Sequence, residues 1–402
     1  MIVRGGKLVD TQGERPGDLI IDNGTIVARA ATATDEVIDA TGLIVLPGIV
    51  DLGVFAVERG ASAAGGITRV ALMPDQSPVL DDPGPVQRAA LAAKPALWVH
   101  PIAAATKGLR GVELAEYALM ARAGAKVVAT GRGWLSDAGV MRRVLSYASS
   151  LGLTVIAHAE DAGLVGNAVA TEGQTATLHG LAAAPSIAEA MAVARDLMLV
   201  EDTGARLHFR QITTARALEL IRDAKARGLP VTCGIAPTHL LLNDIAVGGY
   251  RSFARLSPPL RDDADRRACI EALRDGTIDV LCSAHDPRGA EVKRLPFADA
   301  EPGASGAETL LALALGLVRD DVIDLPRLAA LTSANPAAIL GVDCGRLGEG
   351  APADITLVDV DRPWRIDGSA FVSNAGNTPF DGLPVQGKVV RTIKGGRTIY
   401  AA

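Results

Sequence analysis

The sequence predicts an α/β fold, a (β/α)₈ TIM-type barrel with a small β-sandwich domain formed by both termini. The middle of the chain repeats a short apolar run, a loop and an amphipathic helical stretch. Both ends instead carry short β-prone runs separated by Gly and Asp turns. At 402 residues the chain has room for a barrel and an appendage. We therefore expect residues 1–47 plus 350–402 to form the β-sandwich, and residues 48–349 to form the barrel.

The apolar runs of the middle region predict the strands of the barrel. The run Leu153–Ala157 has continuous apolar character, which is typical of a parallel strand buried on both faces. Eight such candidate strands lie near residues 44–55, 67–74, 96–104, 125–130, 153–159, 206–213, 231–237 and 278–284. In barrels of this kind the functional side chains stand at the carboxyl ends of the strands.

Local signals place two of the helices and one hairpin. Ser186 and Glu189 have the spacing of a capping box, and the helix they would open carries an apolar face of Ile187, Met191, Ala194 and Met198. A second helix is predicted from Thr214 to a stop at Gly228. The Asn23–Gly24 pair between two β-prone runs predicts a tight hairpin.

Composition excludes several classes of protein. The net charge of −6 and an aromatic content of 3% argue against a nucleic-acid binder, which needs a basic face and stacking rings. No apolar run approaches the ~18 residues of a membrane span, and the N-terminus lacks the apolar core of a signal peptide. We expect a cytoplasmic protein without membrane or nucleic-acid partners. Its four scattered cysteines predict buried free thiols rather than disulfides.

Short motifs along nearly the whole chain resemble the amidohydrolase superfamily, and most closely the dihydroorotases. They occur in the family's order. They are Pro47–Asp51, Ala64–Thr68, Met73–Pro74, Thr106–Gly108, Val155–Asp161, Pro258–Arg261, Leu295–Phe297, Thr332–Pro336, Gly350–Asp354 and Asn377–Phe380. The resemblance implies a barrel whose strand ends hold one or two zinc ions, which activate water to cleave a cyclic amide.

The positions where this family holds its metal are nearly all changed. His158, which ends the fifth strand, is the one position that keeps a ligand. The remaining positions that correspond to ligands, or to the aspartate that takes a proton from water, are Gly53, Phe55, Thr130, Gln211 and Ala284. Because a zinc site needs three or four protein ligands, we expect no metal, no cofactor and no catalytic residues here. The phenyl ring of Phe55 suggests that side chains fill the former site.

The positions that would bind substrate are altered as well. Val57 stands where the family has a carboxylate-binding arginine, Asp75 and Ser257 replace asparagines, and Arg288 replaces a histidine. His285 and Asp286 are adjacent and resemble an acid–base pair, but neighbouring strand residues point to opposite faces. We interpret these residues, Val57, Asp75, Ser257, His285 and Arg288, as vestigial substrate-binding positions.

Other polar residues have simpler interpretations. His208 and His239 lie on or near strands, where a hydrogen-bonded core histidine is the common case. Glu160 and Asp161 resemble a catalytic carboxylate pair, but acidic residues are also favoured at a helix N-terminus, which we prefer.

Three hypotheses for function follow. The first is a non-catalytic dihydroorotase homologue that supports assembly or stability of aspartate carbamoyltransferase in pyrimidine biosynthesis, as the resemblance to members without a zinc site implies. The second is a cyclic amide hydrolase with an atypical site around His158, Gln211, Asp75, His285 and Arg288. The third is a module that binds a small carboxylate through Arg288 without turnover. Either a homo-oligomer or a hetero-oligomer is compatible with the first.

Overall fold

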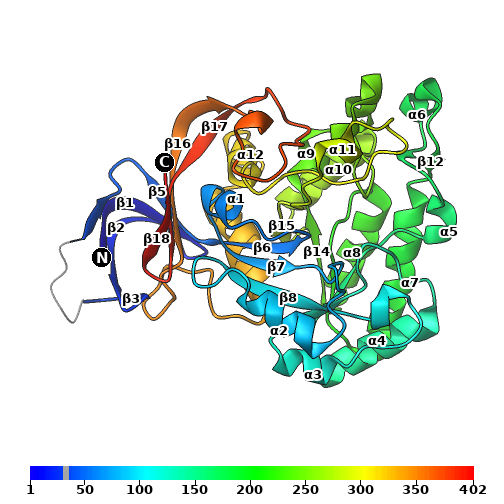
Figure 1. The fold of residues 1–402 in the computed structure, drawn as a ribbon, viewed down its shortest axis with the longest axis horizontal. Helices are drawn as coiled ribbons and strands as arrows, with labels where there is room; N and C mark the ends of the chain where they lie inside the picture. Colours follow the sequence, from blue (N-terminus) through cyan, green and yellow to red (C-terminus); the bar gives the residue numbers. More distant parts are fainter. Residues whose placement is uncertain (30–35) are drawn as a thin grey trace.

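The computed structural model describes residues 1–29 and 36–402, and its centre is a parallel eight-stranded sheet that curves into a barrel (Figure 1). The sequence predicted a strand in each of the eight places. The barrel strands are β6 (Ile49–Val54), β7 (Ile67–Leu72), β8 (Trp98–Ala104), β9 (Val127–Ala129), β10 (Val155–Ala157), β13 (Leu207–Phe209), β14 (Val231–Ile235) and β15 (Val280–Leu281).

The barrel strands follow one another in chain order from β6 to β15, and every neighbouring pair is parallel. Hydrogen bonds also connect the first barrel strand, β6, and the residue after it with the residues that follow the last strand, β15. The Ser283 backbone N–H donates to Asp51 Oδ1 at 2.9 Å, and the Phe55 N–H donates to the His285 carbonyl at 2.9 Å. Burial raises the pKa of Asp51, although its hydrogen bonds from Ser283 oppose this.

Both termini contribute to a second sheet, which lies beside the barrel in Figure 1 and carries the N- and C-terminal ends of the chain. Its order is β18-β17-β16-β5-β1-β2-β3, with β4 paired to β1. The strands are β1 (Ile2–Asp10), β2 (Gly13–Asp22), β3 (Thr25–Val27), β4 (Val37–Asp39), β5 (Ile44–Pro47), β16 (Ile355–Arg365), β17 (Pro384–Lys394) and β18 (Arg397–Ala401). The predicted fold class, a barrel with a β domain built from both ends, is confirmed.

Helices cover the outside of the barrel strands, and the terminal sheet packs against one end of the barrel. The longer helices are α2 (Pro83–Leu91), α4 (Ala138–Ser150), α7 (Ile187–Thr203), α8 (Ala215–Ala226), α10 (Asp263–Arg274) and α12 (Leu310–Arg319). Shorter elements are α1 (Arg59–Ala64), α3 (Tyr117–Arg122), α5 (Ala162–Val165), α6 (Gln174–His179), α9 (Pro237–Leu241), α11 (Ala290–Lys293), α13 (Leu325–Ala329), α14 (Asn335–Leu340), β11 (Ala170–Thr171) and β12 (Ala183–Ala184).

Apolar side chains fill the barrel itself as well as the layer between strands and helices. Side chains from the barrel strands form one cluster inside the barrel: Val50, Leu52, Ala71, Ile102, Val127, Ala129, Ile156 and Val280. A separate and larger cluster lies under the helices, and the terminal sheet has a core of its own. The barrel is therefore a packed core rather than a channel, so a pocket can form only at its two ends.

The prediction for α8 is confirmed, and the one for α7 is wrong in two respects. Thr214 caps α8 by accepting from the Ala217 N–H, and Gly228 follows the helix with φ +80°. Ser186 precedes α7 in helical backbone geometry and makes no side-chain cap. The apolar face expected to be buried is exposed instead, with Met198 exposed by 70%.

The opposite face of α7 is buried, and its apolar residues include Val193, Leu197 and Val200 as well as alanines. Ala188 and Ala192 lie on this buried face, and α7 contacts both α4 and α8.

Two simpler predictions hold. Asn23 and Gly24 both have positive φ, as the tight turn between β2 and β3 requires. The four cysteines are free and buried. None of the helices in the described part of the chain combines the length and apolar character needed to cross a membrane.

Candidate functional site

The carboxyl ends of the barrel strands meet around the side chain of Arg210, which follows β13. Its terminal nitrogens lie 3.4 Å from His158 Nδ1 and 3.4 Å from Gln211 Oε1. Its Cγ and Cδ atoms lie 3.5 Å from the point where a Cβ on Gly53 would stand. Gly53 therefore leaves room for this arginine, and any larger side chain at position 53 would contact it.

Arg210 is a buried cation. Its side chain is 5% exposed, and its Nε has no hydrogen-bond partner among the described residues. Burial lowers the pKa of the guanidinium, but arginine remains charged in proteins. A positive charge is therefore fixed beside His158.

A second arginine closes the site from the solvent side. The Arg132 guanidinium lies over the Phe55 ring, with 3.6 Å between its Cζ and the ring centroid. Two hydrogen bonds of 2.6 and 2.9 Å join it to the carboxylate of Asp286. The phenyl ring thus fills space at the end of β6, and a paired arginine holds it there.

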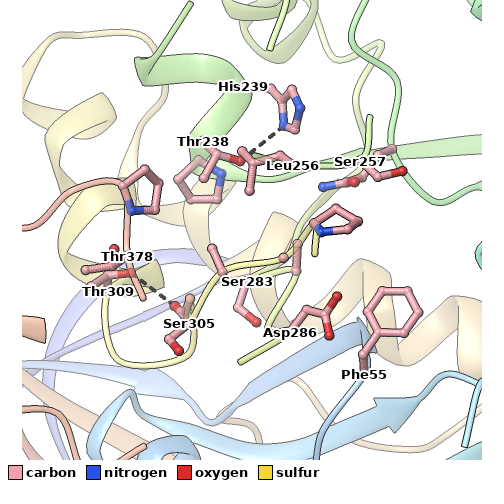
Figure 2. A pocket seen from close by; sticks show the side chains of 18 of the residues that line it. Phe55, Thr238, His239, Leu256, Ser257, Ser283, Asp286, Ser305, Thr309 and Thr378 are labelled. Atoms are coloured by element: carbon pink, nitrogen blue, oxygen red, sulfur yellow. Dashed lines mark hydrogen bonds between the residues drawn. The ribbon is translucent and has the colours of Figure 1, made fainter. Parts of the chain in front are cut away.

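A pocket of about 590 Å³, part of it open to solvent, remains above these residues (Figure 2). The vestigial positions Phe55, Gln211, Ser257 and Ala284 are among the residues that line it. In Figure 2 the Asp286 carboxylate lies beside the Phe55 ring, and hydroxyl groups face the pocket from other segments: Thr238, Ser283, Ser305, Thr309 and Thr378. The charges of Arg132 and Asp286 are held in an ion pair, whereas the Arg210 guanidinium, which also lines the pocket, forms no ion pair within the described residues.

Gly53, Thr130 and His158 lie deeper than this pocket wall. The Thr130 hydroxyl accepts from the His158 N–H at 3.2 Å, and His158 Nε2 lies 3.2 Å from Glu160 Oε2. His158 therefore contacts a carboxylate on one ring nitrogen and a guanidinium on the other.

The remaining predicted substrate positions do not converge on the pocket. His285 Nε2 lies 3.0 Å from Glu58 Oε2. Burial opposes ionisation of Glu58, but hydrogen bonds from His285 and backbone N–H groups lower its pKa to about 2. Arg288 pairs with Asp286 at 3.1 Å and with Glu301 at 2.7 Å, so its guanidinium is already engaged.

Val57 and Asp75 also lie outside the pocket lining. Val57 packs against the main hydrophobic core. Asp75 Oδ1 accepts from the Arg132 N–H at 2.8 Å. Of the residues postulated for an atypical site, Gln211 lines the pocket and the other four do not. Arg288, the residue postulated to bind a carboxylate, already pairs with Asp286 and Glu301.

Comparison with known proteins agrees with this fold. A family model described as the amidohydrolase family matches residues 88–399. The chain belongs to the amidohydrolase family. It is 39% identical to a dihydroorotase of Geobacter metallireducens, over 100% of this chain and 99% of the relative. It is also 39% identical to a dihydroorotase-like protein of Pseudomonas aeruginosa, over 99% of each.

A solved structure gives the same picture for this amidohydrolase. The L-hydantoinase of Arthrobacter aurescens superimposes with a TM-score of 0.87 at 25% identity, covering 99% of this chain and 95% of the other. The similarity includes both the barrel and the terminal β domain.

The side chains of this amidohydrolase do not fit the zinc ions that its family resemblance implies. Of the former ligand positions only His158 offers a metal-binding atom of the usual kind. No group of three or more His, Cys, Asp or Glu side chains in the described ranges could hold a metal ion. The buried Arg210 cation beside His158 would repel one as well.

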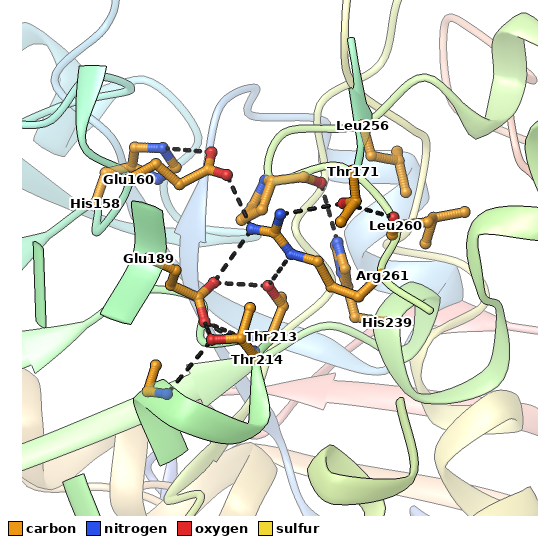
Figure 3. Close-up of polar contacts among 12 residues, drawn as sticks. His158, Glu160, Thr171, Glu189, Thr213, Thr214, His239, Leu256, Leu260 and Arg261 are labelled. Atoms are coloured by element: carbon orange, nitrogen blue, oxygen red, sulfur yellow. Dashed lines mark hydrogen bonds and ion pairs between the residues drawn. The ribbon is translucent and has the colours of Figure 1, made fainter. Parts of the chain in front are cut away.

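Glu160 belongs to a buried ion network behind the site, shown in Figure 3. Arg261 donates to Glu160 Oε1 at 2.9 Å and lies 3.5 Å from Glu189. Burial opposes ionisation of Glu160, but His158 and Arg261 lower its pKa to about 2. The preferred helix-terminus interpretation holds for Asp161, which caps α5, but it is wrong for Glu160.

His208 and His239 are core residues, as expected. His208 Nδ1 lies 2.9 Å from the Thr232 hydroxyl, and His239 Nε2 lies 3.0 Å from the Pro258 carbonyl. Burial lowers the pKa of each, to about 3 for His208 and to about 4 for His239, so both are neutral at pH 7.

Arg210 and Arg132 are not among the site residues that the sequence predicted. Both follow directly after a barrel strand or its first loop residues, and a charged residue there is itself a signal. Arg210 immediately precedes Gln211, which occupies the former ligand position. Because β13 ends at Phe209, strand alternation does not fix the direction of Arg210.

Proposed function

We propose that this chain is a dihydroorotase homologue of pyrimidine biosynthesis that does not catalyse the reaction and instead serves as an assembly or stabilising partner of aspartate carbamoyltransferase. The observation that carries the first half is Arg210. Its guanidinium lies next to His158 and Gln211, and its aliphatic part packs against Gly53, among the positions that correspond to metal ligands in the family it resembles.

Chemistry supports the absence of turnover. Cleavage of an unactivated cyclic amide requires a nucleophile that is strong at neutral pH, and a metal ion supplies it by lowering the pKa of bound water to ~7. Here the donor set is one histidine, and a fixed cation replaces the exchangeable one. An aspartate that could take the proton from water is replaced by Ala284.

The second half of the proposal draws on the resemblance to family members that have lost the zinc site and act beside the transferase. The chain retains a full-length match to relatives named dihydroorotase. A rigid barrel can present an interface after its pocket has lost its chemistry.

The partner test is light scattering on a sizing column, with the chain alone and mixed with aspartate carbamoyltransferase from the same organism. We expect a stable mixed complex in which the transferase is more active or survives longer. Arg210→Met is the matched control, because it changes the former metal site and leaves the surface intact, and it should bind equally well. Two separate peaks at micromolar concentration would contradict the partner role.

The catalytic test measures metal content and dihydroorotate turnover in the purified chain and in the double variant Gly53→His, Phe55→His. We expect neither protein to hold stoichiometric zinc or to turn over substrate. A histidine side chain at position 53 would meet Arg210 and would have to adopt φ +91°, and Thr130, Gln211 and Ala284 would still stand at the other changed positions. Stoichiometric zinc together with turnover in either protein would refute the loss of catalysis.

A further inference from the structure

A second pocket lies at the opposite end of the barrel, where the strands begin and the terminal sheet meets them. It encloses about 980 Å³, including space open to solvent. Arg69 near the start of β7 and Trp98 at the start of β8 are paired across the sheet, and both line it. Lys126, just before β9, and Lys394, the last residue of β17, complete its charged wall.

The pocket has more positive than negative charge. Asp354 is its buried carboxylate, and it is shared by Arg69 at 2.8 Å and Lys394 at 2.8 Å. The other carboxylate in the lining, Asp343, is exposed and pairs with Arg346. Within residues 1–29 and 36–402, Lys126 forms no ion pair, so its charge adds to the excess.

Three cationic side chains lie close to the Trp98 ring. Arg69 Cζ lies 4.5 Å, Lys394 Nζ 4.4 Å and Lys94 Nζ 5.2 Å from the ring centroid. The ring positions the cations through its negative face but supplies no counter-charge.

A buried histidine in the same wall lacks a partner. His100 is 6% exposed, and its Nε2 has no hydrogen-bond partner in the described part of the chain. Burial, together with the charges of Arg69, Lys126, Lys394 and Lys94, lowers its pKa to about 3. It is therefore a neutral imidazole that can offer one N–H, and a buried polar atom without a partner normally has a ligand or a water to satisfy it.

We infer that this pocket binds a phosphate group, either free or carried by a small metabolite, between Lys126, Lys394 and Arg69, with His100 as a neutral hydrogen-bond donor. A phosphate supplies the charge that the cations lack and the acceptor that His100 lacks. The geometry of the pocket also suits a ligand with several oxygens, because the donors approach from separate strands.

The structural role of the ion triad does not account for these features. Arg69, Asp354 and Lys394 tie the barrel to the terminal sheet, and that task is complete without Lys126, Lys94 or an unpartnered His100. The inference concerns a site distant from the pocket of Figure 2, so it does not depend on the proposed partner or on the loss of catalysis.

The test is calorimetric titration of the full chain with inorganic phosphate, with sodium chloride of equal ionic strength as the reference. We expect binding of one phosphate per chain. Lys126→Gln should weaken it by about tenfold, since a charge-assisted hydrogen bond is lost. Lys388→Gln is the matched control, because Lys388 also lies over a tryptophan ring, that of Trp364, but outside this pocket. It should leave phosphate binding unchanged.

A second measurement follows the imidazole signals by NMR in histidine-labelled protein. Phosphate should shift the signals of His100, assigned with the variant His100→Gln, and leave those of the other histidines in place. Tighter binding of a nucleoside monophosphate with the same loss in Lys126→Gln would identify a metabolite as the ligand, and equal binding would identify phosphate itself. No binding at millimolar phosphate, or an equal loss in Lys388→Gln, would overturn the inference.

Discussion

At the scale of single residues, a buried arginine lies at the strand ends where the family resemblance implies a metal ion. The aliphatic part of Arg210 packs against Gly53, and the Arg210 guanidinium brings a fixed charge to the space beside His158. Phe55 and Arg132 then cover it. These residues lie on or after separate strands. They depend on one another because each of them fills, or leaves free, the space beside the next.

Arg210 should contribute more by filling space than by its charge. We expect the free energy of unfolding of Arg210→Met to lie within ~1.5 kcal/mol of the wild-type value or to exceed it, because an incompletely paired buried cation costs desolvation. Arg210→Ala should lose ~2–4 kcal/mol, since it leaves a cavity. Urea unfolding of both variants tests this, and a loss in the methionine variant as large as that in the alanine variant would show that the charge matters more than the space filled.

Glu160 should make the protein sensitive to acid. Its folded pKa is about 2, against 4.5 as the ordinary value, so the carboxylate binds protons less readily in the folded state. This stabilisation is fully present above pH ~4.5 and is lost as pH falls from there towards 2. We expect Glu160→Gln to flatten the fall of the urea midpoint across that range, although Glu58 maintains part of the slope. Identical slopes in variant and wild type would contradict the ion network.

At the scale of elements, α7 shows how tertiary packing changes the use of a local signal. The spacing of Ser186 and Glu189 is that of a capping box, but Glu189 turns into the molecule. Its carboxylate accepts hydrogen bonds from the backbone and hydroxyl groups of Thr213 and Thr214, between 2.6 and 2.9 Å. It therefore fixes the loop between β13 and α8, which contains Arg210 and Gln211 (Figure 3).

Replacement of Glu189 should accordingly be costly. Glu189→Gln would place an amide NH₂ group against the donors of Thr213 and Thr214 and weaken the interaction with Arg261. We expect a loss of ~2–4 kcal/mol in the free energy of unfolding. Met198→Gln on the exposed face of the same helix should change it by less than ~0.5 kcal/mol. Equal effects of the two would show that Glu189 acts only through the helix.

At the scale of the whole molecule, a buried ion triad joins the two domains. Asp354 of the terminal segment accepts from Arg69 of the barrel, from Lys394 of β17 and from the Gly395 N–H at 2.9 Å. The same contacts form the floor of the cationic pocket. The end of the barrel where the strands begin is therefore the junction of the two domains. It also has a concentration of positive charge, although the chain has a net charge of −6.

Loss of the carboxylate should loosen this junction. In Asp354→Asn two buried cations would lose their counter-ion, and we expect a loss of ~3–5 kcal/mol. Asp343→Asn, at the exposed rim of the same pocket, should cost less than ~0.5 kcal/mol because its ion pair is exposed to solvent. Thermal unfolding compares them, and a loss in Asp354→Asn no greater than that in Asp343→Asn would exclude the triad as the tie.

The order of elements and the lineage could be read from the sequence alone. Apolar runs such as Leu153–Ala157 predict buried parallel strands because every residue in such a strand faces either the barrel core or the helices. The motifs and their order identified the family that the comparisons show. The lack of metal-binding groups at Gly53, Phe55 and Ala284, where the resemblance implies ligands or a catalytic aspartate, could also be read there, because a side chain's ability to bind metal is a property of the residue alone.

What occupies the vacated space, and which polar residues meet, depended on the tertiary structure. Arg210 lies beyond the end of its strand, so its direction depends on the gap at Gly53, which is far away in the sequence. The burial of Glu160 and Glu189 and the meeting of Arg69, His100 and Lys394 arise in the same way. Each requires segments distant in the chain to approach, and the energies of packing and desolvation that bring them together have no local signature.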